Sequence, residues 1–129
     1  QLRTYLKKFV SIRDTATKAP KENYYHGFLN GLFSNCKDII TDYHSNYESG
    51  DGYADITFKS RRNSIAVVIE IKAVTREEDL DEYAQRALEQ IEEKNYCAPF
   101  LKISRVKNIL AFGIAFGGKD CAVAFRNVK

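Results

Sequence analysis

The sequence predicts an α/β (α+β) domain built around a central mixed β-sheet with flanking helices. Within the main domain, two segments carry apolar residues at helical spacing, and five shorter segments bounded by turns are typical of β-strands. One of these helices connects the third strand to the fourth, and such a crossover favours parallel pairing between them. At 129 residues, the chain is long enough for one hydrophobic core but not for two.

The first 21 residues are predicted to lie outside the main domain. Residues 2–13 carry apolar side chains at helical spacing, and we expect a helix that runs in from an upstream domain. Residues 15–21 include a proline and are predicted to form a connector. The chain begins at Gln1 and contains no methionine, as expected of a piece of a longer protein. The predicted boundaries are therefore 1–21 for the helix and connector and 22–129 for the main domain.

The first half of the main domain is predicted to contain one helix and three strands. Apolar residues at helical spacing indicate a helix over residues 22–33. Three strands follow, over residues 38–47, 53–59 and 64–72. Successive side chains of a strand point to opposite faces of the sheet, so Glu70 and Lys72 share one face of the third strand.

The second half is predicted to contain a helix and a β-hairpin. An apolar stripe with a period of 3.6 residues indicates a helix over residues 77–96. An apolar strand over 108–116 ends at Gly117-Gly118, a dipeptide typical of tight hairpin turns. A last strand over 120–125 is expected to pair with it, which completes a sheet of five strands.

Charge is unevenly distributed along the chain, although the net charge is only +3. Residues 97–129 contain six Lys and Arg residues and one acid, whereas residues 76–96 contain three Lys and Arg residues and eight acids. One acidic helix therefore nearly cancels a basic C-terminal third. Such a chain can present a basic face to phosphate groups while staying close to neutral overall. An ordinary solvated surface is the alternative interpretation.

The cysteines and the hydropathy pattern indicate a cytoplasmic protein without a membrane partner. Cys36, Cys97 and Cys121 are widely spaced and show no zinc-binding pattern, as expected of reduced thiols. No apolar stretch approaches the length of a membrane span, and no secretory signal is recognisable.

Three charged residues stand inside or at the ends of strand-like segments, where charge is uncommon. Asp55 opens the second strand, and Glu70 and Lys72 close the third. A buried ion is costly unless it is paired or bound to metal. Asp55, Glu70 and the backbone carbonyl of Ile71 would suit Mg²⁺, which takes oxygen ligands, and Lys72 would balance charge on a phosphate. The alternative is a salt bridge between Glu70 and Lys72 at the surface.

These residues carry a resemblance to the PD-(D/E)XK nuclease superfamily, which has a restriction-endonuclease-like core of αβββαβ order; here one strand is added. More narrowly, the chain resembles the nuclease-like domain found C-terminal to AAA-ATPase-like domains in bacterial proteins. The resemblance covers about residues 22–125. The matching segments are Tyr24–His26, Ser45–Asp55, Ile69–Lys72, Ala87–Ile91 with Lys94 and Tyr96, and Gly113–Phe116 with Lys119.

The resemblance implies that Asp55 and Glu70 are ligands of Mg²⁺ or Mn²⁺ and that Lys72 is the catalytic lysine. Ala54 stands where the motif often has proline. Related families carry glutamine with tyrosine four residues later; here Lys94 holds that place after Gln90, and Tyr96 follows two residues on. We expect Gln90 to belong to the site, by binding phosphate or by ordering the Lys72 region.

Further candidates surround this set. Glu48 is expected at the edge of the site, where it reaches a second metal or caps the turn. Superfamily members often contribute an acid from the first helix, so Glu22 or His26 is a second-tier candidate beside Lys94; a structural role is the alternative for His26. Arg61, Arg62 and Lys119 are expected to hold a nucleic-acid backbone.

The predicted function is that of a Mg²⁺-dependent nuclease domain that hydrolyses phosphodiester bonds of DNA. RNA and branched DNA are further candidate substrates. An upstream ATPase-like domain of the same polypeptide is the implied partner, and cutting both strands would favour a homodimer. Two alternatives stay open: a catalytically silent nucleic-acid-binding or protein-interaction module on the same scaffold, and an accessory domain that dimerises its parent.

Overall fold

The computed structural model describes residues 2, 21–50 and 52–129, so nearly all of the predicted N-terminal helix and connector lies outside the described residues. Leu2 is helical and packs against the core. The elements in order are α3 (Lys21–Ser34), β1 (Ile40–Ser49), β2 (Gly52–Ser60), β3 (Ile65–Ala73), the 3₁₀-helix η1 (Glu77–Asp79), α4 (Leu80–Glu93), α5 (Ala98–Leu101), β4 (Asn108–Gly117) and β5 (Asp120–Asn127). The predicted mixed five-stranded sheet with flanking helices is confirmed.

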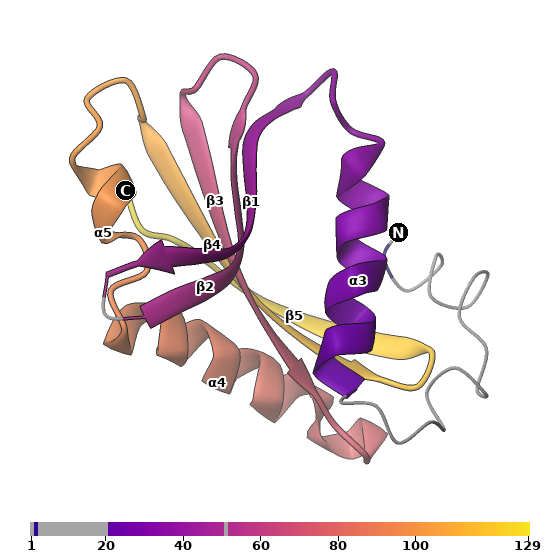
Figure 1. Cartoon of the computed structure of the whole chain (residues 1–129). Helices are drawn as coiled ribbons and strands as arrows, with labels where there is room; N and C mark the ends of the chain where they lie inside the picture. The colour runs from indigo at the N-terminus through magenta and orange to yellow at the C-terminus, as the bar shows by residue number, and fades with distance from the viewer. Residues whose placement is uncertain (1, 3–20, 51) are drawn as a thin grey trace.

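The strands follow one another across the sheet in the order β1-β2-β3-β4-β5. Neighbouring strands are antiparallel except β3 and β4, which pair in parallel from Ile65 opposite Asn108 to Ala73 opposite Phe116. The crossover between these two strands contains α4 and α5, as expected for a parallel connection. Figure 1 shows α3 against one face of the sheet and α4 against the other.

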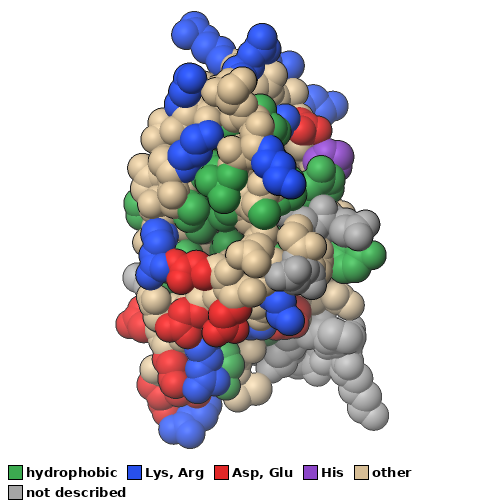
Figure 2. All heavy atoms as spheres, turned by 90° about the vertical axis from the view of Figure 1, so that its left-hand side faces the viewer, with side chains coloured by type: hydrophobic (Ala, Val, Ile, Leu, Met, Phe, Trp, Pro, Cys, Tyr) green, Lys and Arg blue, Asp and Glu red, His purple; other side chains and the backbone are tan. Residues whose placement is uncertain are grey.

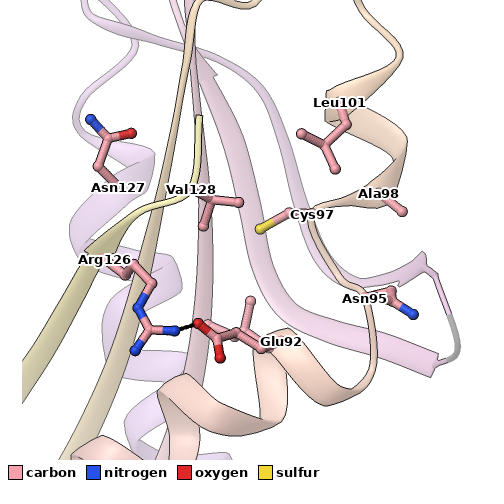
Figure 3. Close-up of a pocket in the computed structure, with 9 residues that line it drawn as sticks. Glu92, Asn95, Cys97, Ala98, Leu101, Arg126, Asn127 and Val128 are labelled. Carbon is pink, nitrogen blue, oxygen red and sulfur yellow. Dashed lines mark ion pairs between the residues drawn. The ribbon is translucent and has the colours of Figure 1, made fainter.

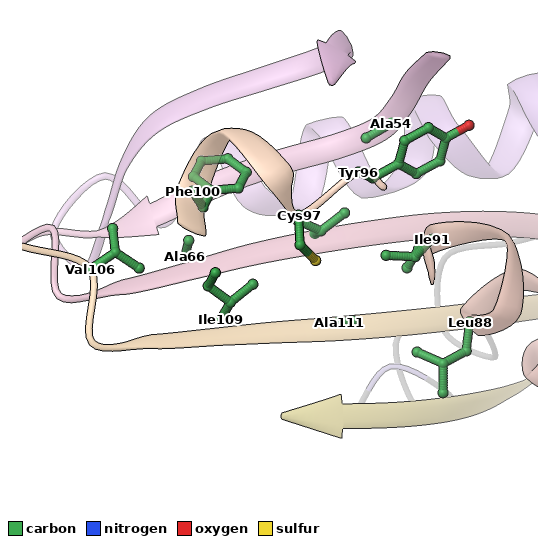
Figure 4. Close-up of a cluster of buried hydrophobic side chains, with 11 residues drawn as sticks. Ala54, Ala66, Leu88, Ile91, Tyr96, Cys97, Phe100, Val106, Ile109 and Ala111 are labelled. Carbon is green, nitrogen blue, oxygen red and sulfur yellow. The ribbon is translucent and has the colours of Figure 1, made fainter. Parts of the chain in front are cut away.

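Alternating residues of β3 divide the apolar core between the two faces. Ile69 and Ile71 belong to the cluster under α3, where the Tyr25 ring stacks on Phe116 with centroids 4.5 Å apart. Ala66 and Val68 belong to the cluster beside α4 and α5, shown in Figure 4. β3 is therefore covered on both sides, which explains its nearly continuous apolar sequence.

α4 packs very closely on the sheet. A Cβ atom added to Gly113 of β4 would lie 2.2 Å from the Ala84 carbonyl oxygen and 2.5 Å from the Leu88 backbone nitrogen. Only glycine fits such an approach of helix to strand. Gly113 thus sets the distance at which α4 presents its side chains to the end of β3.

The elements differ from the prediction most clearly in three places, and the other boundaries agree to within two residues. The first strand begins at Ile40 because residues 36–39 form a turn in which the Cys36 carbonyl accepts two backbone hydrogen bonds. The predicted helix over 77–96 is divided: η1 occupies its first turn, and α4 ends at Glu93 before Asn95 at φ 55°. α5 was not predicted; it is one turn long and contains Pro99 in its first turn. None of the helices in the described ranges is long and apolar enough to span a membrane.

Candidate active site

The three charged residues of the predicted motif lie where β2 and β3 separate. Residue pairing between these strands runs from Lys59 opposite Ala66 to Ile56 opposite Ile69. Asp55 is the next residue of β2, and Glu70 is the next residue of β3. The backbone pairing of β2 with β3 therefore ends one residue before Asp55 and Glu70, so backbone N–H and C=O groups at this point need other hydrogen-bond partners.

The Asp55 carboxylate supplies one of these partners. The backbone N–H of Ile71 donates a hydrogen bond to Asp55 Oδ2, with 2.7 Å between nitrogen and oxygen. This bond continues the connection between the two strands through a side chain. It also fixes the Asp55 carboxylate beside the segment that carries Glu70 and Lys72.

Glu70 is a buried carboxyl group with an incomplete set of partners. Its side chain is only 4% exposed. Gln90 Nε2 donates a hydrogen bond to its Oε2 atom, whereas Oε1 is enclosed and makes no well-formed hydrogen bond within the described residues; the side chain and backbone of Asp55 lie beside this carboxyl group. Burial and then the neighbouring Asp55 carboxylate raise the pKa of Glu70 to about 9, against the opposing attraction of Lys72.

Lys72 is held by the helix. Its Nζ atom donates a hydrogen bond of 2.7 Å to Gln90 Oε1, and no ion pair joins Lys72 to Glu70. The alternative of a surface salt bridge between Glu70 and Lys72 is therefore wrong: Glu70 is buried, and an amide from α4 stands between the two charges. The site is assembled from β2, β3 and α4.

The donor set fits a hard divalent cation. Mg²⁺ in proteins takes one or two carboxylates and keeps water or phosphate oxygens on its other positions. Two carboxyl groups converge here, and the Asp55 carboxylate helps to raise the pKa of Glu70, as expected of neighbouring acids that could share a cation. Within the ranges that the structure describes, no group of three or more His, Cys, Asp and Glu side chains is arranged to hold a metal. Asp55 and Glu70 would hold the ion, and the Ile71 carbonyl stays a predicted ligand.

The second-tier candidates are dispersed. His26 of α3 is hydrogen-bonded through Nε2 to Ser45 Oγ of β1, at 2.7 Å, an arrangement that ties helix to strand. Glu22 is exposed in the first turn of α3.

Lys94 is exposed at the C-terminal end of α4. It lines a polar pocket of about 400 Å³ together with Lys72 and Gln90. The backbone of Glu48 pairs with Tyr53 in the β1–β2 hairpin, and its side chain lies outside the described set.

The predicted nucleic-acid contacts lie at opposite ends of the sheet. Lys119 follows Gly118 in the β4–β5 turn, close to the C-terminal end of β3. Arg61 and Arg62 occupy the β2–β3 turn before the first residue of β3. At about 3.3 Å per residue, this turn and Lys72 are separated by more than about 20 Å. Arg61 and Arg62 therefore do not border the two carboxylates.

The resemblance drew attention to Tyr96 two residues after the expected tyrosine position, but it was not placed among the candidate site residues. The structure buries this residue, and Gln90 Nε2 donates a hydrogen bond to its hydroxyl at 3.3 Å. Its position six residues after Gln90 matches no common helical spacing, because α4 has already ended. The tyrosine that related families carry after the glutamine was the available signal, although its spacing differs here.

A second pocket lies apart from this site. It has a volume of about 340 Å³ and lies between the C-terminal ends of α4 and β5, as Figure 3 shows. Arg126 and Glu92 form an ion pair at its rim, and Cys97 and Leu101 line its apolar part. None of Asp55, Glu70 and Lys72 borders it.

The fold and the Asp-Glu-Lys set define the class of protein. The sequence model of the PD-(D/E)XK nuclease superfamily matches residues 20–126. The chain therefore belongs to the PD-(D/E)XK nuclease superfamily. No curated protein matches it.

Proposed function

We propose that this chain is a metal-dependent nuclease domain that hydrolyses phosphodiester bonds of DNA. The observation that carries this proposal is the buried carboxyl group of Glu70 beside the Asp55 carboxylate, with the Lys72 ammonium on the same strand held by Gln90. Two neighbouring carboxyl groups, one of them buried, are costly to ionise together unless a cation is bound between them. The membership of the nuclease superfamily supports the same conclusion.

Each residue would contribute a separate property. Mg²⁺ or Mn²⁺, when bound by Asp55 and Glu70, would polarise the phosphate and lower the pKa of a bound water molecule. Lys72 would place positive charge beside the phosphate and orient the attacking water. Gln90 keeps the Lys72 ammonium directed away from Glu70, since its carbonyl oxygen accepts from Nζ. Asp55 is fixed by the Ile71 N–H before any ligand arrives.

Exposed cations offer contacts for a nucleic-acid backbone. Lys and Arg side chains gather at the upper end of the face in Figure 2, and Asp and Glu side chains gather at its lower end. The β2–β3 turn and the segment before β4 meet where the Lys107 N–H donates to the Ser64 carbonyl. The exposed cations of these segments are Arg61, Arg62, Lys102, Arg105 and Lys107. We infer that they contact phosphates distant from the cleaved bond.

The wider setting stays proposed: a bacterial, cytoplasmic protein, an upstream AAA-ATPase-like domain and a homodimer for cutting both strands. The rival function is a silent nucleic-acid-binding or protein-interaction module on the same scaffold.

A substrate panel tests the proposal. Purified protein is incubated with supercoiled, linear and branched DNA and with RNA, in Mg²⁺, Mn²⁺ or chelator, beside Asp55→Ala and Lys72→Ala. Metal-dependent cleavage of DNA that both substitutions abolish is the expected result. Absence of cleavage from the folded wild-type protein, together with absence of calorimetric metal binding, would support the silent module instead.

A further inference from the structure

We propose that Tyr96 is a positioning residue, which fixes the side-chain amide of Gln90 and, through it, the Lys72 ammonium. This inference rests on the proposed nuclease site and adds a residue to it. Gln90 contacts both Glu70 and Lys72 of β3. The orientation of its amide therefore decides whether each of these groups faces the amide oxygen or the amide nitrogen.

The hydrogen bonds of Gln90 define one orientation of the amide. Oε1 accepts from Lys72, while Nε2 donates both to Glu70 Oε2 and to the Tyr96 hydroxyl. An amide nitrogen has two N–H groups, so these contacts use both. In the reversed orientation, the carbonyl oxygen would face the Glu70 carboxyl and the NH₂ group would face the ammonium. Lys72, which can only donate, decides between the two orientations, and Tyr96 supplies the third contact that holds the amide in place.

Tyr96 is itself firmly placed. Its side chain is 4% exposed, and its backbone N–H donates to the Ile91 carbonyl at 3.1 Å, which closes the end of α4. A Cβ atom added to Gly52, the first residue of β2, would lie 3.3 Å from the Tyr96 hydroxyl. The ring is thus confined between the helix end and the strand that carries Asp55.

A second close approach joins the same two segments. Gly50 has φ +62°, and a Cβ atom added there would lie 2.2 Å from the Asn95 carbonyl oxygen. The β1–β2 turn therefore rests directly on the residues that follow α4. Tyr96 connects this close contact to Gln90, so movement of β2 relative to α4 would reach Lys72 through the Tyr96 hydroxyl.

The first test measures the amide directly and does not depend on activity. In nuclear magnetic resonance spectra, the side-chain NH₂ protons of Gln90 are expected to exchange slowly with water in the wild-type protein. Tyr96→Phe keeps the ring and removes the hydroxyl, and we expect exchange about tenfold faster or more. The control Tyr53→Phe removes a hydroxyl from a residue that is 62% exposed and should leave the Gln90 protons unchanged. Unchanged exchange in Tyr96→Phe would overturn the proposal.

The second test separates positioning from simple structural support. Tyr96→Phe should lower the single-turnover cleavage rate about tenfold while DNA affinity and metal affinity stay within twofold. In a Gln90→Ala background, the same substitution should change the rate less than twofold, because the group that it positions is gone. An equal loss in both backgrounds would contradict the role assigned here. If wild-type protein cleaves nothing while the amide test succeeds, the proposed function fails and the positioning of Gln90 stands.

Discussion

Lys72 and Gln90 are joined by a hydrogen bond of 2.7 Å, from the ammonium at the end of β3 to an amide oxygen on α4. The same amide donates to the buried Glu70, so one neutral side chain separates a cation from an acid two residues away on the strand. A direct ion pair between Glu70 and Lys72 would neutralise both side chains. The site would then bind a metal ion or a phosphate group more weakly. Gln90 keeps the two groups distinct.

Replacement of Gln90 by alanine should therefore impair the site more than the fold. We expect Gln90→Ala to lower the cleavage rate by about 10- to 100-fold, as is usual when a residue that orients a metal site is lost. Stability should fall by about 1–3 kcal/mol, since Glu70 Oε2 loses its donor in a buried position. Single-turnover kinetics and urea denaturation measure the two effects. Gln85→Ala, at an exposed position of the same helix, should leave both values unchanged.

Glu70 should make the metal-free protein sensitive to pH. Its carboxyl group keeps a proton up to about pH 9 in the folded chain but loses it near pH 4.5 when unfolded. Between these values the folded state binds more protons, so the free energy of unfolding should decrease as pH rises from about 4.5 to 9. Glu70→Gln, which resembles the protonated acid, should remove this decrease.

Denaturation in chelator at several pH values measures this effect. At pH 8 the Glu70→Gln variant is expected to be more stable than the wild-type protein. The exposed substitution Glu89→Gln should leave the wild-type pH dependence in place. A wild-type stability that is flat across this range would show that the Glu70 carboxyl ionises normally.

Gly113 should tolerate no side chain. Gly113→Ala places a methyl group against the backbone of α4, and relief requires the helix to move away from β4. We expect a loss of about 1–3 kcal/mol, typical of overpacking. Gly31→Ala is the matched control, because a Cβ atom there meets nothing within 4 Å on helix α3. That substitution should instead stabilise the protein by about 0.5–1 kcal/mol. Thermal and chemical denaturation would measure the predicted decrease in the free energy of unfolding for Gly113→Ala and the predicted increase for Gly31→Ala.

The arginines of the β2–β3 turn should affect binding rather than chemistry. Arg61→Ala with Arg62→Ala is expected to weaken DNA binding and to reduce the slope of log affinity against log salt by about 1.8. The single-turnover rate at saturating protein should stay within twofold, because the turn lies at the other end of β3 from Lys72. Arg61→Lys with Arg62→Lys should retain the slope. Loss of the rate with unchanged affinity would place these residues at the site instead.

The sequence predicted most of the fold because its periodic signals coincide with burial. The alternation in β3 and the apolar stripe of α4 reflect the two faces that the structure covers. α5 escaped prediction because four residues are too few to show a helical period. The turn before Ile40 was missed for a similar reason. It depends on backbone hydrogen bonds that the Cys36 carbonyl accepts, and no pattern of residue types predicts them.

The candidate site was predictable only in part. Asp55, Glu70 and Lys72 could be recognised because charge is rare inside apolar strands. The resemblance led us to expect Gln90 near Lys72, and the two residues are in contact, but which of their atoms meet depends on the distance between α4 and β3, which Gly113 sets through packing. Tyr96 approaches Gln90 only because the chain leaves the helical path at Asn95.

The most direct test of the central claim is the single-turnover rate of DNA cleavage in Mg²⁺ or Mn²⁺, measured for wild type and for Lys72→Ala. The control is Lys37→Ala, which replaces an exposed lysine between α3 and β1. We predict metal-dependent cleavage by wild type and Lys37→Ala and a loss of about 100-fold or more in Lys72→Ala, with all three proteins folded and binding DNA alike. Cleavage by Lys72→Ala at the wild-type rate would contradict a catalytic site built from Asp55, Glu70 and Lys72.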